Sequence, residues 1–212
     1  MTLDRKVVSI LLVSICRLLT GIRARWQSPP DLRRPTIFYA NHSSHLDGLV
    51  IWSSMPASLR DVVHPVAAAD YWLKSPLRRY LALRVFQAVL VERRRANADA
   101  PGDDKRDPLL SLRLALEEGQ SLILFPEGTR GDGNELQNFK SGLYHLTQQF
   151  PDVQLVPVWL ENLNRVLPKG SRLVVPIICR ATFGAPLDAP AADESKTAFL
   201  QRARSALEAL SS

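Results

Sequence analysis

The sequence predicts one α/β domain, with a mostly parallel or mixed sheet flanked by helices and a membrane-associating helix before it. Short runs of β-branched and aromatic residues alternate with segments of helical period, as in a sheet covered by helices. The 212 residues suffice for one well-packed core. Hydrophobic residues make up 46% of the chain and charged residues 23%, which is ordinary for a globular protein. The sequence shows no internal repeat, which disfavours a solenoid or a propeller.

The N-terminal segment DRKVVSILLVSICRLLTGIRARW predicts a helix. It starts with basic residues and is apolar from Val7 to Cys16, where Arg17 interrupts it. That is short of the roughly 20 apolar residues of a spanning helix, and the arginines argue against a secretory signal. A helix lying in the interface of an anionic leaflet fits the pattern, and a helix docked on the protein's own core is the alternative. We therefore predict a membrane-interface helix in residues 1–30 and the domain in residues 31–212.

The first half of the domain alternates as expected for a layered α/β protein. TIFYA, residues 36–40, predicts a buried strand, and residues 46–55 a short helix. Residues 61–69 predict the second strand, residues 71–83 helical or irregular structure, and residues 87–91 the third strand. A polar loop, ANADAPGDDKR, then follows.

The second half begins with a capped helix. Asp107 and Pro108 suit its first turn and Gly119 its end. We expect a strand at residues 121–125, a long loop, and a helix at residues 139–150.

The chain is expected to end with strands at residues 153–160 and 172–184 and a helix over residues 194–210. Pro157 and Pro176 suggest that these two strands are edge strands or are bent. One face of that helix should be apolar, and it carries Phe199, Ala203, Ala206, Leu207 and Leu210.

Charge and cysteine content narrow the class of partner. The net charge is +6, mostly from arginine, which suits phosphate recognition or a solvated surface. Aromatic residues do not interleave with a basic face, so we expect no nucleic-acid partner. Cys16 and Cys179 lie in apolar surroundings far apart in the sequence, which predicts buried thiols and a reducing compartment.

The loop NHSSHLD, residues 41–47, allows three interpretations. His42 and His45 are three apart and could share a helix face, but no further ligands complete a tetrahedral metal site, so we predict no metal. His42 and Asp47 could form a proton-transfer pair if the chain folds back between them. Alternatively, Ser43, Ser44 or Asn41 could cap a helix, with Asp47 favoured there by the helix dipole. The loop alone does not decide between the cap and catalysis.

A second polar cluster follows the strand at residues 121–125. In FPEGTRGDGNELQNFKSG, Arg130 and Lys140 suit a phosphate, and Glu127 could orient a hydroxyl or the basic groups. A salt-bridged surface loop is the alternative. Both clusters follow strands, and in parallel sheets the loops after the strands form the site.

These residues resemble the lysophosphatidic acid acyltransferase family of glycerolipid acyltransferases. NHSSHLD matches its Asn-His-x-x-x-x-Asp block, and FPEGTR matches its other diagnostic block. AVLVERR resembles the intervening block and assigns its arginine to Arg93, while LVPVWL resembles the fourth. The chain departs from the family at Gly131, where serine is common, and at Gln87 and Ala88, where a glycine is usual.

The resemblance implies an O-acyltransferase that uses acyl-CoA or acyl-carrier protein as co-substrate, with no cofactor. The acceptor would be a lysophospholipid, with lysophosphatidic acid giving phosphatidic acid, at the cytoplasmic side of a membrane to which the protein is peripheral or monotopic. His42 would be the general base and Asp47 would orient it. The residues expected to hold the acceptor are Arg93, Glu127, Gly128, Thr129 and Arg130, to which we add Lys140. A catalytically silent lipid-binding protein on the same fold is the competing class.

Overall fold

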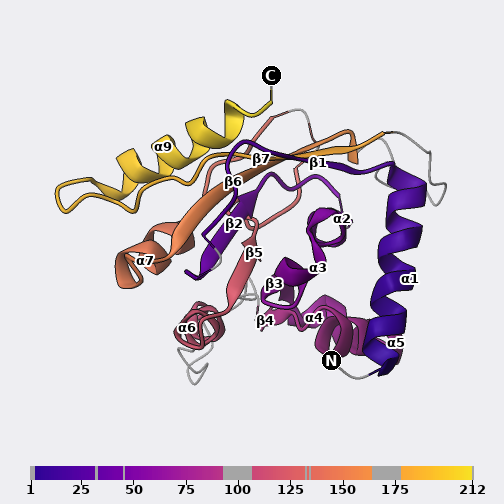
Figure 1. The fold of residues 1–212 in the computed structure, drawn as a ribbon. Coiled ribbons are helices and arrows are strands. Elements are labelled where there is room, and N and C mark those ends of the chain that lie inside the picture. Colours follow the sequence, from indigo (N-terminus) through magenta and orange to yellow (C-terminus); the bar gives the residue numbers. More distant parts are fainter. Residues whose placement is uncertain are drawn as a thin grey trace.

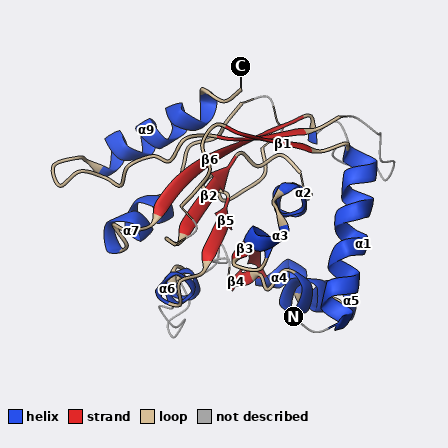
Figure 2. Ribbon diagram, in the orientation of Figure 1, coloured by secondary structure: helices blue, strands red, loops and turns tan. Residues whose placement is uncertain are grey.

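In the computed structural model, the structure describes residues 3–31, 33–44, 46–92, 107–131, 133, 135–163 and 178–211. These form a mixed sheet with helices on both faces (Figures 1 and 2). The predicted α/β class is therefore confirmed. The positions of Arg93, of His45, of the polar loop 96–106 and of residues 172–177 in the strand expected at 172–184 lie outside the described residues.

The described sheet has seven strands in the order β1-β7-β6-β2-β5-β3-β4. Its strands are β1 (Arg23–Trp26), β2 (Thr36–Ala40), β3 (Val63–Ala68), β4 (Val89–Val91), β5 (Ser121–Leu124), β6 (Gln154–Glu161) and β7 (Arg180–Phe183). The strands from β6 to β4 run parallel to one another, and β7 is antiparallel to β6. β1 was not predicted, and it pairs in parallel with β7 at the edge.

The central strand is β2, and all five of its residues are buried. Phe38 lies opposite Ile123 of β5 and opposite Val156 of β6. A strand paired on both sides and covered on both faces is expected to be apolar throughout, which explains why TIFYA shows no alternation. Because β2 is fixed on every side, the loop that follows it starts from a well-determined position.

One face of the sheet is covered by the N-terminal helices. These are α1 (Leu3–Thr20), α2 (Asp47–Ser54), α3 (Ala57–Arg60), α4 (Ala69–Trp72), α5 (Pro76–Tyr80) and the π-helical turn η1 (Leu81–Val85). The core beneath them contains Phe38, Trp52, Phe86 and Phe183, with Trp26 stacked on Phe183 at a centroid distance of 3.8 Å. None of the helices among the described residues has the length and apolarity needed to cross a bilayer.

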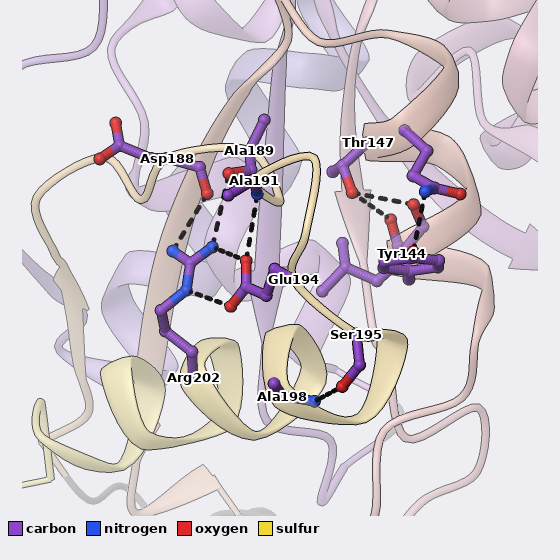
Figure 3. Close-up of polar contacts among 11 residues, drawn as sticks. Tyr144, Thr147, Asp188, Ala189, Ala191, Glu194, Ser195, Ala198 and Arg202 are labelled. Atoms are coloured by element: carbon purple, nitrogen blue, oxygen red, sulfur yellow. Dashed lines mark hydrogen bonds and ion pairs between the residues drawn. The ribbon is translucent and has the colours of Figure 1, made fainter.

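The other face is covered by α6 (Leu110–Glu117), α7 (Gly142–Gln149) and α9 (Lys196–Glu208). α9 buries Phe199, Ala203 and Leu207, as its periodicity predicted. Figure 3 shows how Arg202 anchors the loop before α9: its guanidinium donates to both oxygens of Glu194, at 2.8 and 2.6 Å, and to the carbonyl of Asp188 at 3.2 Å. α9 and the loop before it lie on the opposite side of the sheet from α1 and α2 (Figure 1).

Two backbone conformations explain sequence features of the domain. Gly119 ends α6 with φ of +76°, as predicted for a C-terminal glycine. Gln87 has φ of +48°, a left-handed conformation that costs a non-glycine residue roughly 1–2 kcal/mol. Gln87 and Ala88 stand where the resembling family usually has a glycine, the residue that adopts such a φ most easily.

The predicted division between residues 1–30 and 31–212 stays a prediction. α1 confirms the N-terminal helix, while β1 belongs to the main sheet although its residues precede 31. Cys16 and Cys179 are both buried, and burial raises the pKa of each thiol, in Cys179 to about 11. Both thiols are therefore poor nucleophiles at neutral pH.

Candidate active site

Two loops meet at the carboxyl edge of the sheet. Residues 41–47 follow β2 and residues 125–131 follow β5, and the two strands pair in parallel with Tyr39 opposite Leu124. The backbone N–H of Gly131 donates to the carbonyl of His42 at 2.8 Å. The structure thus brings together the two polar clusters that the sequence singles out.

His42 and Asp47 form a hydrogen-bonded pair. The Nδ1 atom of His42 lies 2.8 Å from Oδ2 of Asp47. Asp47 is the first residue of α2, and the chain folds back between the two residues, as the proton-transfer hypothesis requires. The Asp47 side chain is fully buried, whereas 21% of the His42 side chain is exposed. With Nδ1 engaged by the carboxylate, Nε2 is the ring nitrogen left for a substrate.

One oxygen of Asp47 holds the whole turn. Oδ2 also accepts from the backbone N–H groups of Ser43 and Ser44, at 2.7 and 2.8 Å. Oδ1 is buried and has no hydrogen-bond donor among the described residues. The N-cap residue of α2, Leu46, makes no side-chain cap bond, and Ser44 Oγ accepts from the N–H of Leu46 at 3.2 Å. Among the described residues, Asp47 therefore organises the loop and Ser44 bonds the start of the helix.

Phe125 fixes the face of the His42 ring. The two rings stack with centroids 4.2 Å apart and an angle of 19° between their planes. Asp47 therefore holds the edge of the imidazole by a hydrogen bond, and Phe125 packs against one face of the ring. Pro65 of β3 and Phe125 both approach Gly48, where an added Cβ would lie 3.9 Å from each. This side of the site is thus closed by apolar groups.

Asn41 ties the first loop to β6. Its side-chain amide donates to the carbonyl of Leu160 at 3.0 Å, and its oxygen accepts from the N–H of Leu160 at 2.8 Å. The amide thereby imitates a strand and extends the β2–β6 pairing beyond Ala40. These two hydrogen bonds fix the backbone immediately before His42.

Glu127 ties the first loop to the second. The residue is only 2% exposed, and its Oε1 accepts from the backbone N–H of His42 at 2.7 Å. Its Oε2 accepts from the N–H of Gln137 at 2.9 Å. Burial raises the pKa of the Glu127 carboxyl, while these two backbone bonds act in the opposite direction. Because both oxygens are used, the contacts favour a positioning role over the direct contact with an acceptor that the sequence suggested.

The remaining predicted acceptor residues line the exposed side of the second loop. Gly128 has φ of +71°, and a Cβ at that position would lie 3.3 Å from Cγ of Lys140. Lys140 donates its backbone N–H to the carbonyl of Pro126 at 2.7 Å, which closes the loop. Thr129 and Arg130 are exposed, and the hydroxyl of Thr129 lies 3.4 Å from Oε1 of Gln137. Two exposed cations thus lie on a loop bonded directly to His42.

Sequence reasoning did not assign the roles that three residues have in this site. Phe125, Asn41 and Gln137 act through a ring stack and through backbone groups, and none of these contacts leaves a periodic or spacing signal. Asn41 and Phe125 are the first residues of the two matched motifs, whereas nothing in the sequence singles out Gln137.

Other possible sites do not coincide with this one. Within the described ranges, no three His, Cys, Asp or Glu side chains gather as metal ligands would. His64 lies buried in β3, and His145 is on α7. Two open hollows of about 490 Å³ each flank the loop before α9, one lined by His145 and Gln148 and the other by Arg202. Their lining includes no residue of the loops around His42.

Comparison with known proteins places these features in a family context. A sequence model of the acyltransferase family matches residues 22–161. Lyso-ornithine lipid O-acyltransferase of Rhizobium meliloti (strain 1021) is 40% identical over 128 residues, which are 60% of this chain and 39% of that protein. A 1-acyl-sn-glycerol-3-phosphate acyltransferase of Limnanthes alba is 26% identical over 176 residues, 80% of this chain and 56% of that protein. The chain spans less than two thirds of the length of both relatives.

The crystal structure of the 1-acyl-sn-glycerophosphate acyltransferase of Thermotoga maritima has the same fold. It superposes with a TM-score of 0.68 at 20% sequence identity and covers 98% of this chain and 81% of that one. At that identity the likeness concerns the fold alone.

Proposed function

Because the chain belongs to the acyltransferase family, we propose that it transfers a fatty acyl group from a thioester donor to the free hydroxyl of a lysophospholipid. The donor is acyl-CoA or acyl-carrier protein, and the first-choice acceptor is lysophosphatidic acid, which gives phosphatidic acid. The observation that carries the proposal is the 2.8 Å contact between His42 Nδ1 and Asp47 Oδ2 at the carboxyl edge of the sheet.

In this mechanism His42 is the general base. Nε2 takes the proton of the acceptor hydroxyl as its oxygen attacks the thioester carbonyl. The buried Asp47 carboxylate holds the imidazole in the required tautomer and stabilises the imidazolium. Collapse of the tetrahedral intermediate expels the thiolate, which takes the proton back from Nε2. The acceptor oxygen attacks directly, so no covalent acyl-enzyme, metal or cofactor takes part.

The acceptor's headgroup would contact the exposed loop beside His42. Arg130 and Lys140 supply two cations there, and Thr129 supplies a hydroxyl. Guanidinium groups bind phosphate bidentately, which suits lysophosphatidic acid. The 40% identity to a lyso-ornithine lipid O-acyltransferase favours a second candidate acceptor, a lyso-ornithine lipid. The loop's one departure from the family's block, Gly131, lies beside Gln137, whose Nε2 would be 3.5 Å from a Cβ there.

The composition of α1 supports a membrane setting. Its buried stripe is made of small residues, namely Ser9, Val13, Cys16 and Thr20. Its exposed residues include large apolar ones, namely Leu3, Val7, Ile10, Leu11, Ile15, Leu18 and Leu19. A helix of a water-surrounded protein normally turns its large apolar residues inward, so this distribution suits lipid on the outer side. We propose that the protein is peripheral or monotopic on the cytoplasmic side of a membrane, where reducing conditions suit its two free cysteines.

The decisive experiment measures acyl transfer by His42→Ala and Asp47→Asn. Purified protein receives labelled acyl-CoA or acyl-carrier protein and a panel that includes lysophosphatidic acid and a lyso-ornithine lipid. Each variant should lose about 10²–10⁴-fold in kcat, the usual contribution of a positioned base, and keep its folded circular dichroism spectrum. His145→Ala and Asp193→Asn change the same residue types at exposed positions of α7 and of the loop before α9, and should keep wild-type rates. Full activity in either dyad variant would refute the mechanism.

A further inference from the structure

A second group of exposed apolar residues lies on the segment of the chain that connects β3 to β4. Leu73, Leu77 and Leu83 are 46%, 68% and 41% exposed. They belong to the segment that contains α4, α5 and η1, which begins directly at the carboxyl end of β3. Exposed leucines are unremarkable singly, but a group of them on one segment indicates a contact surface.

This segment is packed firmly, so its leucines are not exposed through loose folding. Ala82 and Val85 of η1 are fully buried. Ser75 caps α5 by accepting from the N–H of Arg78 at 3.3 Å. Trp72 lies edge-on to Phe86 of the core with centroids 6.1 Å apart. The exposed leucines are therefore carried by a segment that is itself anchored to the core.

The segment is predominantly basic, with one acidic residue, the exposed Asp70, in the first turn of α4. Residues 71–86, YWLKSPLRRYLALRVF, contain one lysine and three arginines but no aspartate or glutamate. Lys74, Arg79 and Arg84 are exposed. The guanidinium carbon of Arg78 lies 4.3 Å from the centroid of the Tyr71 ring, so this cation is stacked over an aromatic face. Leucines with cations among them are the composition of an element lying in the interface of an anionic leaflet.

Aromatic residues complete the pattern. Tyr71, Trp72 and Tyr80 are each partly exposed, with rings that are apolar except for one polar atom. Such rings are enriched at the level of lipid headgroups. A protein partner able to cover the same surface would have to be acidic and apolar together, whereas an anionic bilayer offers both properties in one plane.

The position of the segment links it to α1 and to the site. The hydroxyl of Tyr80 donates to Oδ2 of Asp4 at 3.3 Å, so the end of α5 and the start of α1 are neighbours (Figure 1). β3 pairs with β5, whose loop carries Phe125 and Glu127. We propose that residues 71–84 are a second membrane-contact surface, which binds the anionic leaflet of a bilayer beside α1. Two contacts, rather than α1 alone, would then fix how the carboxyl edge of the sheet faces the bilayer that supplies the lysolipid.

The test is partition of the purified full chain onto sucrose-loaded vesicles, measured by sedimentation. One vesicle contains 30% phosphatidylglycerol in phosphatidylcholine and the other phosphatidylcholine alone. Leu77→Ser should lower partition on both by about tenfold, because a leucine contributes about 1.4 kcal/mol or more when it leaves water. Lys74→Gln with Arg79→Gln should lower partition roughly 30-fold, on the anionic vesicle only, at about 1 kcal/mol per cation.

Matched controls change the same residue types elsewhere. Leu114, on α6, is 51% exposed, so Leu114→Ser removes a comparable exposed leucine from the other face of the sheet. Arg33→Gln with Lys196→Gln removes two exposed cations outside the segment. Both controls should bind as the wild type does. Leu18→Ser, at an 82% exposed position of α1, reports the first contact separately.

The inference rests on the proposed membrane setting, but its test requires no acyl transfer. Wild-type binding by Leu77→Ser, or an equal loss in Leu114→Ser, would overturn it. A changed oligomeric state of Leu77→Ser with unchanged partition would overturn it in favour of a protein contact. Acyl transfer to a detergent-dispersed acceptor should stay at the wild-type rate in the segment variants. Lack of such transfer in the wild type would refute the proposed function and leave the vesicle result valid.

Discussion

Replacing Glu127 by glutamine separates a positioning role from contact with the acceptor. Both carboxylate oxygens accept backbone N–H groups, from His42 at 2.7 Å and from Gln137 at 2.9 Å. Glutamine offers one carbonyl oxygen, and its NH₂ group would face the second donor. One of the two bonds must therefore be lost in a site that is only 2% exposed.

The size of the effect follows from that lost bond. A hydrogen bond to a charged acceptor contributes about 1.5–3 kcal/mol, and relief from burying the charge offsets part of it. We expect the free energy of unfolding to fall by about 2 kcal/mol at pH 7. Displacement of a catalytic group by about 1 Å can cost 10²-fold in rate, so kcat should fall by 10- to 100-fold with little change in the acceptor's KM.

The pH dependence of stability gives a second readout with a fixed sign. Burial raises the pKa of Glu127 above its ordinary value of 4.5, so the folded state binds more protons than the unfolded state between 4.5 and the raised pKa. In that window the contribution of Glu127 to stability falls as the pH rises, and it is constant above the raised pKa. The glutamine variant lacks this slope, so its deficit relative to the wild type should be larger at pH 5 than at pH 8.

Urea unfolding and steady-state kinetics of Glu127→Gln measure these quantities, with Glu117→Gln, at an exposed position of α6, as the matched control. A variant with wild-type stability and kcat but a raised KM for the acceptor would refute the positioning role. It would place the carboxylate on the acceptor, as the sequence suggested.

Two further variants test single residues. Arg130→Ala should raise the KM for lysophosphatidic acid by about 10-fold or more, because a charge-assisted bond contributes 1.5–3 kcal/mol, and steady-state kinetics with varied acceptor measure it; an unchanged KM would remove Arg130 from the acceptor site. Gln87→Gly should raise the free energy of unfolding by about 1 kcal/mol, since φ of +48° is strained only when a Cβ is present; a destabilised variant in urea would show that the Gln87 side chain contributes more than the strain costs.

The sequence predicted those parts of the fold that have strong local signals. TIFYA, flanked by a proline and a polar loop, gave β2 to the residue, and the periodicity of the last helix gave the buried face of α9. β1 could not be predicted, because RARW is short, carries two arginines and is a strand only through its pairing with β7. An edge strand made by tertiary pairing has no period of its own to detect.

The residues of the candidate site also differ in how much of their role the sequence shows. His42 and Asp47 could be singled out because their chemistry is unusual for a loop. Glu127 was also singled out, as a residue that holds the acceptor, but its contacts with backbone N–H groups were not predicted. Its partners are backbone N–H groups, which every residue has, so no residue type in the sequence reveals them. Spacing can therefore identify the group that reacts, while the groups that hold it appear only when the backbone is placed.

The outer surface of α1 illustrates the opposite limit. The segment is apolar nearly all round, so its sequence alone cannot assign the inner and outer faces. The structure assigns them: Ser9, Val13, Cys16 and Thr20 are buried, and Val8 and Leu12 pack against the core. The guanidinium of Arg17 donates to the carbonyl of Ser53 at 3.1 and 3.2 Å. The inner face of α1 is thus smaller and more polar than its outer face, where Leu3, Ile10 and Leu18 are exposed. This difference between the two faces, which the sequence pattern could not show, is the basis of the proposed contact with lipid.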